Sequence, residues 1–233
     1  MDRITRKELK TDKFALEVGH TVDFFEEHRT QILRYGAIAI AVVLVVLALF
    51  FYRREQQIER QQVLANAIQV QEAPVGGAAP GTPLVFPTQE AKDQQATKAF
   101  GEVIAKYPGS DEAMIAEYYL GSIAADQGKL ADAEKRFSKV AEGSDKNYAS
   151  LAKLSLAQVY FIQGRADQGE KLLRSVMEHP TVFVSREQAA IVLARELAKT
   201  KPAEARKLLD PLRSSRSAVS QVAIQMYSEL PQK

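Results

Sequence analysis

The feature that most constrains the fold is a run of eighteen uncharged residues from Tyr35 to Tyr52, which reads YGAIAIAVVLVVLALFFY. As a helix, the run would be about 27 Å long, close to the thickness of the hydrocarbon core of a bilayer. It has no polar stripe, so a soluble protein would have to bury it on every face. Aromatic residues lie at both ends, and Arg34 and Arg53 flank the run, as is common at membrane interfaces. We therefore expect residues 32–52 to form one transmembrane helix.

The basic residues around this run give two indications of its orientation. Close to the run, the C-terminal side carries slightly more of them: Arg29 and Arg34 precede it, and Arg53, Arg54 and Arg60 follow it. The whole N-terminal side carries seven, and the positive-inside rule applies to short segments, whereas long domains cross largely regardless of charge. Charge therefore favours a cytoplasmic N-terminus. A cleaved signal peptide fits poorly, because the preceding tail is long and no small-x-small site follows the run.

The N-terminal tail, residues 1–31, has a helical pattern of its own. Phe14, Val18, Val22 and Phe25 recur at helical spacing and predict an amphipathic helix. Two interpretations of its apolar stripe are open. The helix either lies on the membrane surface or against its own neighbours, or it docks a cytoplasmic partner.

The chain after the membrane contains a repeat. Large apolar residues recur 37, 36 and 36 residues apart, and a small residue stands four places before each: Ala96 and Phe100, Ala133 and Phe137, Gly169 and Leu173, Ala205 and Leu209. A second series, offset from the first, starts at Leu120, Leu156 and Leu193 and is followed by turns with Gly128, Gly164 and Pro202. Small residues let two helices approach closely, and the large residue on the same face fills the space between repeats. We expect helical pairs stacked into a solenoid over residues 89–214.

The ends of this solenoid differ from its middle. Residues 53–70 continue the membrane helix, and Leu64 to Ile68 copy the start of a first repeat whose second helix follows only after residues 71–88. The prolines and glycines within residues 71–88 predict a mobile loop. Its apolar stretch, Leu84 to Phe86, either packs on the solenoid or forms a partner-binding tip. Residues 215–233 predict a capping helix, with Ala218, Val219, Val222, Ala223, Met226, Tyr227 and Leu230 at helical spacing.

The repeat resembles the tetratricopeptide repeat, because Leu120-Gly121 and Leu156 to Tyr160 follow its L-G-x-x-Y signature and Ala133 to Phe137 its A-x-x-x-F signature. Pro108 and Pro180 stand where that family often places a closing proline. The layout of tail, membrane helix, split first repeat and small repeat domain is similar to that of the YfgM-like ancillary subunits of the SecYEG translocon. That resemblance implies a bacterial inner-membrane protein with its repeat domain in the periplasm, where it links the translocon to periplasmic chaperones.

Composition and motifs argue against several other functions. The 31 basic and 29 acidic residues give a net charge of +2, too small for a nucleic-acid-binding field. Cysteine is absent, and only His20, His28 and His179 could serve as histidine ligands or bases. Gly128-Lys129 is followed by Leu130, so it is no P-loop, and no G-x-S-x-G motif occurs. We expect no enzyme, no cofactor and no metal site.

Binding of proteins is the function that remains. First helices line the concave face of such a solenoid, and six positions there are not needed for repeat packing: Tyr118, Ser122, Gln158, Phe161, Arg195 and Lys199. Tyr118 and Phe161 are aromatic anchors of the kind found at binding hot spots, unless they are partly buried in the stack. The main hypothesis is a membrane-tethered scaffold that assists secretion or envelope-protein biogenesis. The alternative is a structural tether that oligomerises in the envelope or division machinery.

Overall fold

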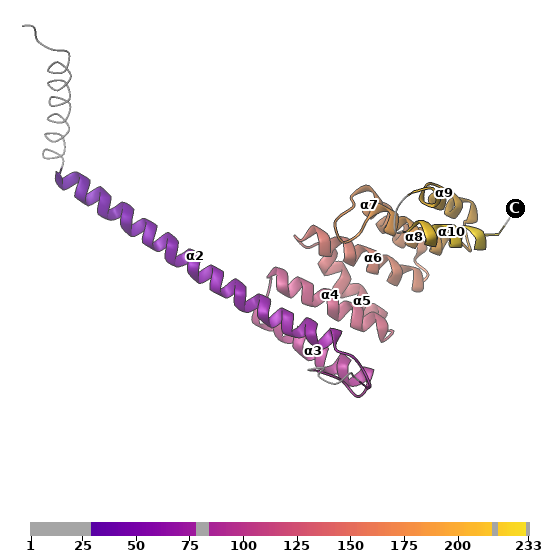
Figure 1. The fold of residues 1–233 in the computed structure, drawn as a ribbon, viewed down its shortest axis with the longest axis horizontal. Helices are drawn as coiled ribbons and strands as arrows, with labels where there is room; N and C mark the ends of the chain where they lie inside the picture. Colours follow the sequence, from indigo (N-terminus) through magenta and orange to yellow (C-terminus); the bar gives the residue numbers. More distant parts are fainter. Residues whose placement is uncertain (1–28, 78–83, 216–218, 232–233) are drawn as a thin grey trace, which may run out of the picture. The chain divides into compact units, whose positions relative to one another are not determined.

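The computed structural model describes residues 29–77, 84–215 and 219–231, apart from the side chains of Arg29 and Ile32. Within these ranges the chain is all-helical and contains no strand, which confirms the predicted fold class (Figure 1). The helices are α2 (Arg29–Glu72), α3 (Gln89–Lys106), α4 (Asp111–Asp126), α5 (Leu130–Ala141), α6 (Lys146–Ile162), α7 (Ala166–Glu178), α8 (Arg186–Leu197), α9 (Pro202–Arg213) and α10 (Ser220–Glu229). The stripe from Phe14 to Phe25 lies outside the described residues.

The apolar run lies within α2, whose large apolar side chains between Leu33 and Tyr52 are exposed. In the described part of the chain, α2 is the one helix long and apolar enough to cross a membrane. The helix continues to Glu72, two residues beyond the predicted end of the helical segment at residue 70. It stops there because the residue before a proline disfavours helical backbone, and Ala73 precedes Pro74.

Three kinds of signal start the helices of the repeats. A side-chain oxygen caps the N-terminus of α3, α4, α6 and α8; Ser110, for example, accepts a hydrogen bond of 3.1 Å from the backbone N–H of Ala113. The turns before α5 and α7 contain Gly128 and Gly164 with φ of 71° and 76°. Glycine adopts this left-handed conformation without the steric cost of a Cβ. The helix α9 instead begins with Pro202.

The packing positions of the repeat form the core. The large members of the series, Phe100, Phe137, Leu173 and Leu209, are at most 1% exposed, and the small residues four places before each of them are buried as well. Consecutive helices pack on each other from α3 to α10. In the first of three apolar clusters, Leu64 and Ala67 of α2 are buried together with residues of α3 and α4. This arrangement is the helical-pair stack that the spacing predicts.

The insert and the C-terminal helix are described in part. Pro74 and Phe86 are joined by a 3.0 Å hydrogen bond from the Phe86 N–H, and Phe86 accepts one of 2.9 Å from Gly76. Leu84, Val85 and Phe86 are half-buried, while residues 78–83 lie outside the described ranges.

The helix α10 packs on α9 and α8. It buries Ala223, and Leu230, which directly follows the helix, is buried as well. Val222 faces solvent, however, although its spacing placed it on the buried stripe. Ala218 is not among the described residues.

Candidate partner-binding face

The first helices α4, α6 and α8 enclose a groove of about 400 Å³. It is lined by Ser122, Ala125, Asp126, Phe137, Ser155, Gln158, Val159, Ile162 and Glu196. Phe137 and Val159 are almost completely buried, so they form an apolar floor. Hydroxyl, amide and carboxylate groups stand around this floor. The groove is therefore a mixed surface that could accept both apolar and polar groups of a partner.

The structure brings only two of the six sequence-predicted residues into this groove. Ser122 and Gln158 line it, and the Ser122 hydroxyl also donates to the Tyr118 carbonyl at 3.3 Å. Arg195 on α8 and Lys199 just after it are exposed, without a partner in the described part of the chain, but do not line the groove. Tyr118 and Phe161 are half-buried and are not among the lining residues either.

Tyr118 belongs to an aromatic network that crosses the repeats. Its ring contacts those of Tyr119, Phe137 and Tyr148 at centroid distances of 5.8, 5.6 and 5.8 Å. The network continues from Tyr119 to Phe100 and from Tyr148 to Phe183. Burial, together with nearby Tyr119, raises the pKa of Tyr148 to about 12. Truncating Tyr118 would therefore disturb packing as well as any contact with a partner.

Phe161 fills space that a glycine leaves open. A Cβ at Gly169 would lie 2.7 Å from the Cε2 atom of Phe161 and 2.9 Å from the Ala157 carbonyl oxygen. The ring of Phe161 also packs on the C-terminal apolar cluster. Its half-burial thus follows from the close approach of α6 and α7 at Gly169.

Sequence reasoning missed Asp126, Ile162 and Glu196. Neither carboxylate has a polar partner among the residues that the structure describes, and the side chain of Ile162 is 69% exposed. Glu196 occupies the fourth position of its first-helix signature, where the two preceding repeats have Ile123 and Val159 buried in the core. A comparison of equivalent repeat positions contains this signal, because a carboxylate replaces a core aliphatic residue there.

The carboxylates of the second helices, in contrast, link successive repeats. Glu134 on α5 accepts hydrogen bonds from Arg165 at 2.7 and 2.8 Å, and Arg165 is the residue that precedes α7. In the next repeat, Glu170 on α7 accepts a 3.0 Å bond from Lys201, which precedes α9. Arg165 holds the pKa of the Glu134 carboxyl below its usual range, and Arg174, followed by Lys201, does the same for Glu170.

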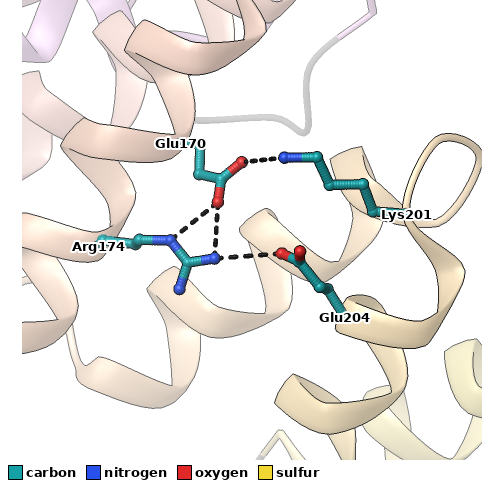
Figure 2. Close-up of polar contacts among 4 residues, drawn as sticks. All are labelled: Glu170, Arg174, Lys201 and Glu204. Carbon is teal, nitrogen blue, oxygen red and sulfur yellow. Dashed lines mark hydrogen bonds and ion pairs between the residues drawn. The ribbon is translucent and has the colours of Figure 1, made fainter.

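Figure 2 shows the second of these links, in which the Glu170 carboxylate lies between the Lys201 ammonium and the Arg174 guanidinium. Arg174 also reaches Glu204 at 3.3 Å. The position equivalent to Glu134 and Glu170 in the last repeat holds Arg206, which donates instead to the carbonyls of Leu230 and Pro231 beyond α10. In these three units, the same repeat position therefore joins the unit to the part of the chain that follows it along the stack.

Among the described residues, no three histidines or carboxylates lie close enough to hold a metal ion. His179 ends α7, and its Nδ1 atom lies 3.2 Å from the Ser175 carbonyl oxygen, a local contact at a helix terminus. What the arrangement can do chemically is bind another surface through the groove.

Comparison with known proteins gives one match. The family described as tetratricopeptide repeat-like domain matches residues 23–190, which include the apolar part of α2 and the repeats up to α8. Searches of curated proteins and of solved structures returned no match. Since the family match covers more than half of the chain and the helical pairs pack as its repeats require, the chain belongs to the tetratricopeptide repeat-like domain family.

Proposed function

We propose that this protein is a single-pass membrane scaffold whose repeat domain binds protein partners during secretion or envelope-protein biogenesis. The observation that carries the proposal is that α2 contributes to two different parts of the molecule. One helix contains both the exposed apolar stretch and, further along, Leu64 and Ala67, which are buried in the core of the repeat domain. The apolar stretch and part of the repeat core therefore belong to one helix.

Ion pairs support this role of the second part of α2. Glu59 accepts a 2.6 Å bond from Lys106 of α3, and Arg60 lies 3.3 Å from the Glu112 carboxylate of α4. These pairs and the Leu64 cluster tie the residues that follow the apolar stretch to the repeat helices. The second part of α2 is therefore a structural part of the repeat domain.

The finer parts of the proposal rest on charge and on the resemblance to YfgM-like translocon subunits. Seven basic residues on the N-terminal side favour a cytoplasmic N-terminus, which would place the repeats in the periplasm of a bacterium. A reporter fused after Lys233 should then be active only outside the cytoplasm. Activity of that fusion in the cytoplasm would overturn the proposed location.

Purification of the tagged full chain from detergent-solubilised membranes tests the proposed function. Recovery of translocon subunits and periplasmic chaperones, absent from a purification with an unrelated single-pass protein, is the expected result. Recovery of only the chain itself, or of division proteins, would instead support the alternative of an oligomerising tether.

A further inference from the structure

We propose that the groove between α4, α6 and α8 binds a cationic, partly apolar protein segment, in which basic side chains flank an aliphatic one. This inference rests on the proposed function, because it names the chemistry of the partner that the scaffold would hold. Three observations carry it: the unpaired carboxylates of the groove, the apolar surface between them, and the position of the nearest basic residues.

The charge of the groove is negative. Asp126 and Glu196 are its charged lining residues, and no lysine or arginine lines it. The two carboxylates have no hydrogen-bond or ion-pair partner in the parts of the chain that the structure describes. Several other carboxylates of the repeats, such as Glu117 with Arg136 and Lys139, are satisfied within the fold. The groove carboxylates are therefore available for basic groups of a partner.

The apolar part of the groove favours a peptide over a simple ion. Ile162 stands exposed at the end of α6, next to the buried floor of Phe137 and Val159. A partner that covered Ile162 would remove apolar surface from water, which favours binding roughly in proportion to the area. The hydroxyls of Ser122 and Ser155 and the amide of Gln158 can hydrogen-bond to the backbone of the same segment. A peptide meets all of these groups, whereas a small cation meets only the carboxylates.

Basic residues near the groove do not reverse this preference. Arg195 and Lys199 are exposed, but neither lines the groove. They stand on and just after α8, where they could meet an acidic residue outside the bound segment. The negative charge of the groove thus predicts that it selects positively charged segments. It attracts basic side chains and repels acidic segments.

Fluorescence anisotropy with the full chain in neutral detergent micelles tests the inference. The probes are three labelled nonapeptides of one design, with an isoleucine flanked by two lysines, two glutamines or two glutamates. The lysine peptide should bind most tightly, and added salt should weaken its binding, because screening acts on partly exposed charge pairs. Asp126→Asn and Glu196→Gln should each weaken it by up to about fivefold, and Ile162→Ser by about fivefold.

A matched control and a reversal make the test specific. Glu102→Gln removes an exposed carboxylate on α3, away from the groove, that has no partner among the described residues, and should leave binding unchanged. The double variant Asp126→Lys and Glu196→Lys, with unchanged helicity by circular dichroism, should prefer the glutamate peptide. Equal binding of all three peptides, or no effect of the groove variants, would overturn the inference.

The inference and the proposed function can fail separately. If the wild-type chain recovers translocon subunits but does not bind the lysine peptide, the groove assignment is wrong and the scaffold function stands. If the lysine peptide binds with the expected variant pattern but membranes yield no secretion partners, the groove assignment stands and the proposed function is wrong.

Discussion

Substituting two glycines within helices, Gly169 on α7 and Gly101 on α3, tests how closely the repeat helices pack. Both stand where alanine would be the better helix former, by up to about 1 kcal/mol. A Cβ at Gly101 would meet no atom within 4 Å, whereas one at Gly169 would lie 2.9 Å from the Ala157 carbonyl oxygen and 2.7 Å from the Phe161 ring. The ring can turn slightly, but the carbonyl belongs to the backbone of α6. Gly169→Ala must therefore separate α6 and α7.

The magnitudes decide the sign of each substitution. Gly101→Ala keeps the gain in helix propensity, so it should stabilise the protein by up to about 1 kcal/mol. Gly169→Ala receives the same gain but also an overpacking cost of about 1–3 kcal/mol, so we expect a net loss. For a domain of this size, 1 kcal/mol shifts the melting temperature by about 2–4 °C. The two variants should therefore differ by roughly 5 °C, with wild type between them.

Thermal unfolding followed by far-ultraviolet circular dichroism measures this difference. The full chain in detergent is the sample, and all three proteins are compared at one detergent concentration. Loss of helix at the same temperature for both variants would show that Gly169 is not at a close helix contact. An increase in melting temperature for Gly169→Ala, equal to that for Gly101→Ala, would refute the assignment of Gly169 to the small-residue series.

Three further predictions concern core packing and the dependence of stability on low and on high pH. Ala133→Leu adds bulk at a fully buried small-residue position and should cost about 1–3 kcal/mol; an unchanged melting curve would mean that the repeat register is wrong. Because its basic partners lower the pKa of Glu170, this carboxylate contributes stability above its unfolded pKa, and the contribution disappears as the pH falls through the folded value. Glu170→Gln should therefore reduce the free energy of unfolding at neutral pH by at most about 1 kcal/mol and lower the melting temperature accordingly. In acid the substitution should have no effect, and melting curves at both pH values test this. Tyr148, whose pKa is about 12, should ionise late in an ultraviolet titration, and Tyr148→Phe should remove that late step; stability should fall above pH 10 in the wild type because the unfolded phenol ionises first.

The fold class and the packing positions could be predicted from the sequence because both depend on local, repeated patterns. The run from Tyr35 to Tyr52 has no polar face whatever its surroundings, and a structure cannot change that property. The series that contains Phe100 and Phe137 recurs because every helical pair buries the same face against its neighbour. Even the end of α2 follows from a local rule, the restriction that Pro74 places on the residue before it.

The binding face, in contrast, depends on how consecutive pairs are rotated against each other. In the sequence, all positions that repeat packing does not require look equally available for binding a partner. In the structure, however, Tyr118 belongs to an aromatic network and Phe161 fills the space above Gly169. Asp126 and Glu196 come from different repeats, 70 residues apart, and only the stacking of α4, α6 and α8 places them around one groove. Periodicity fixes which side of a helix is buried, whereas the exposed residues that share a surface are decided by the angle between neighbouring helices.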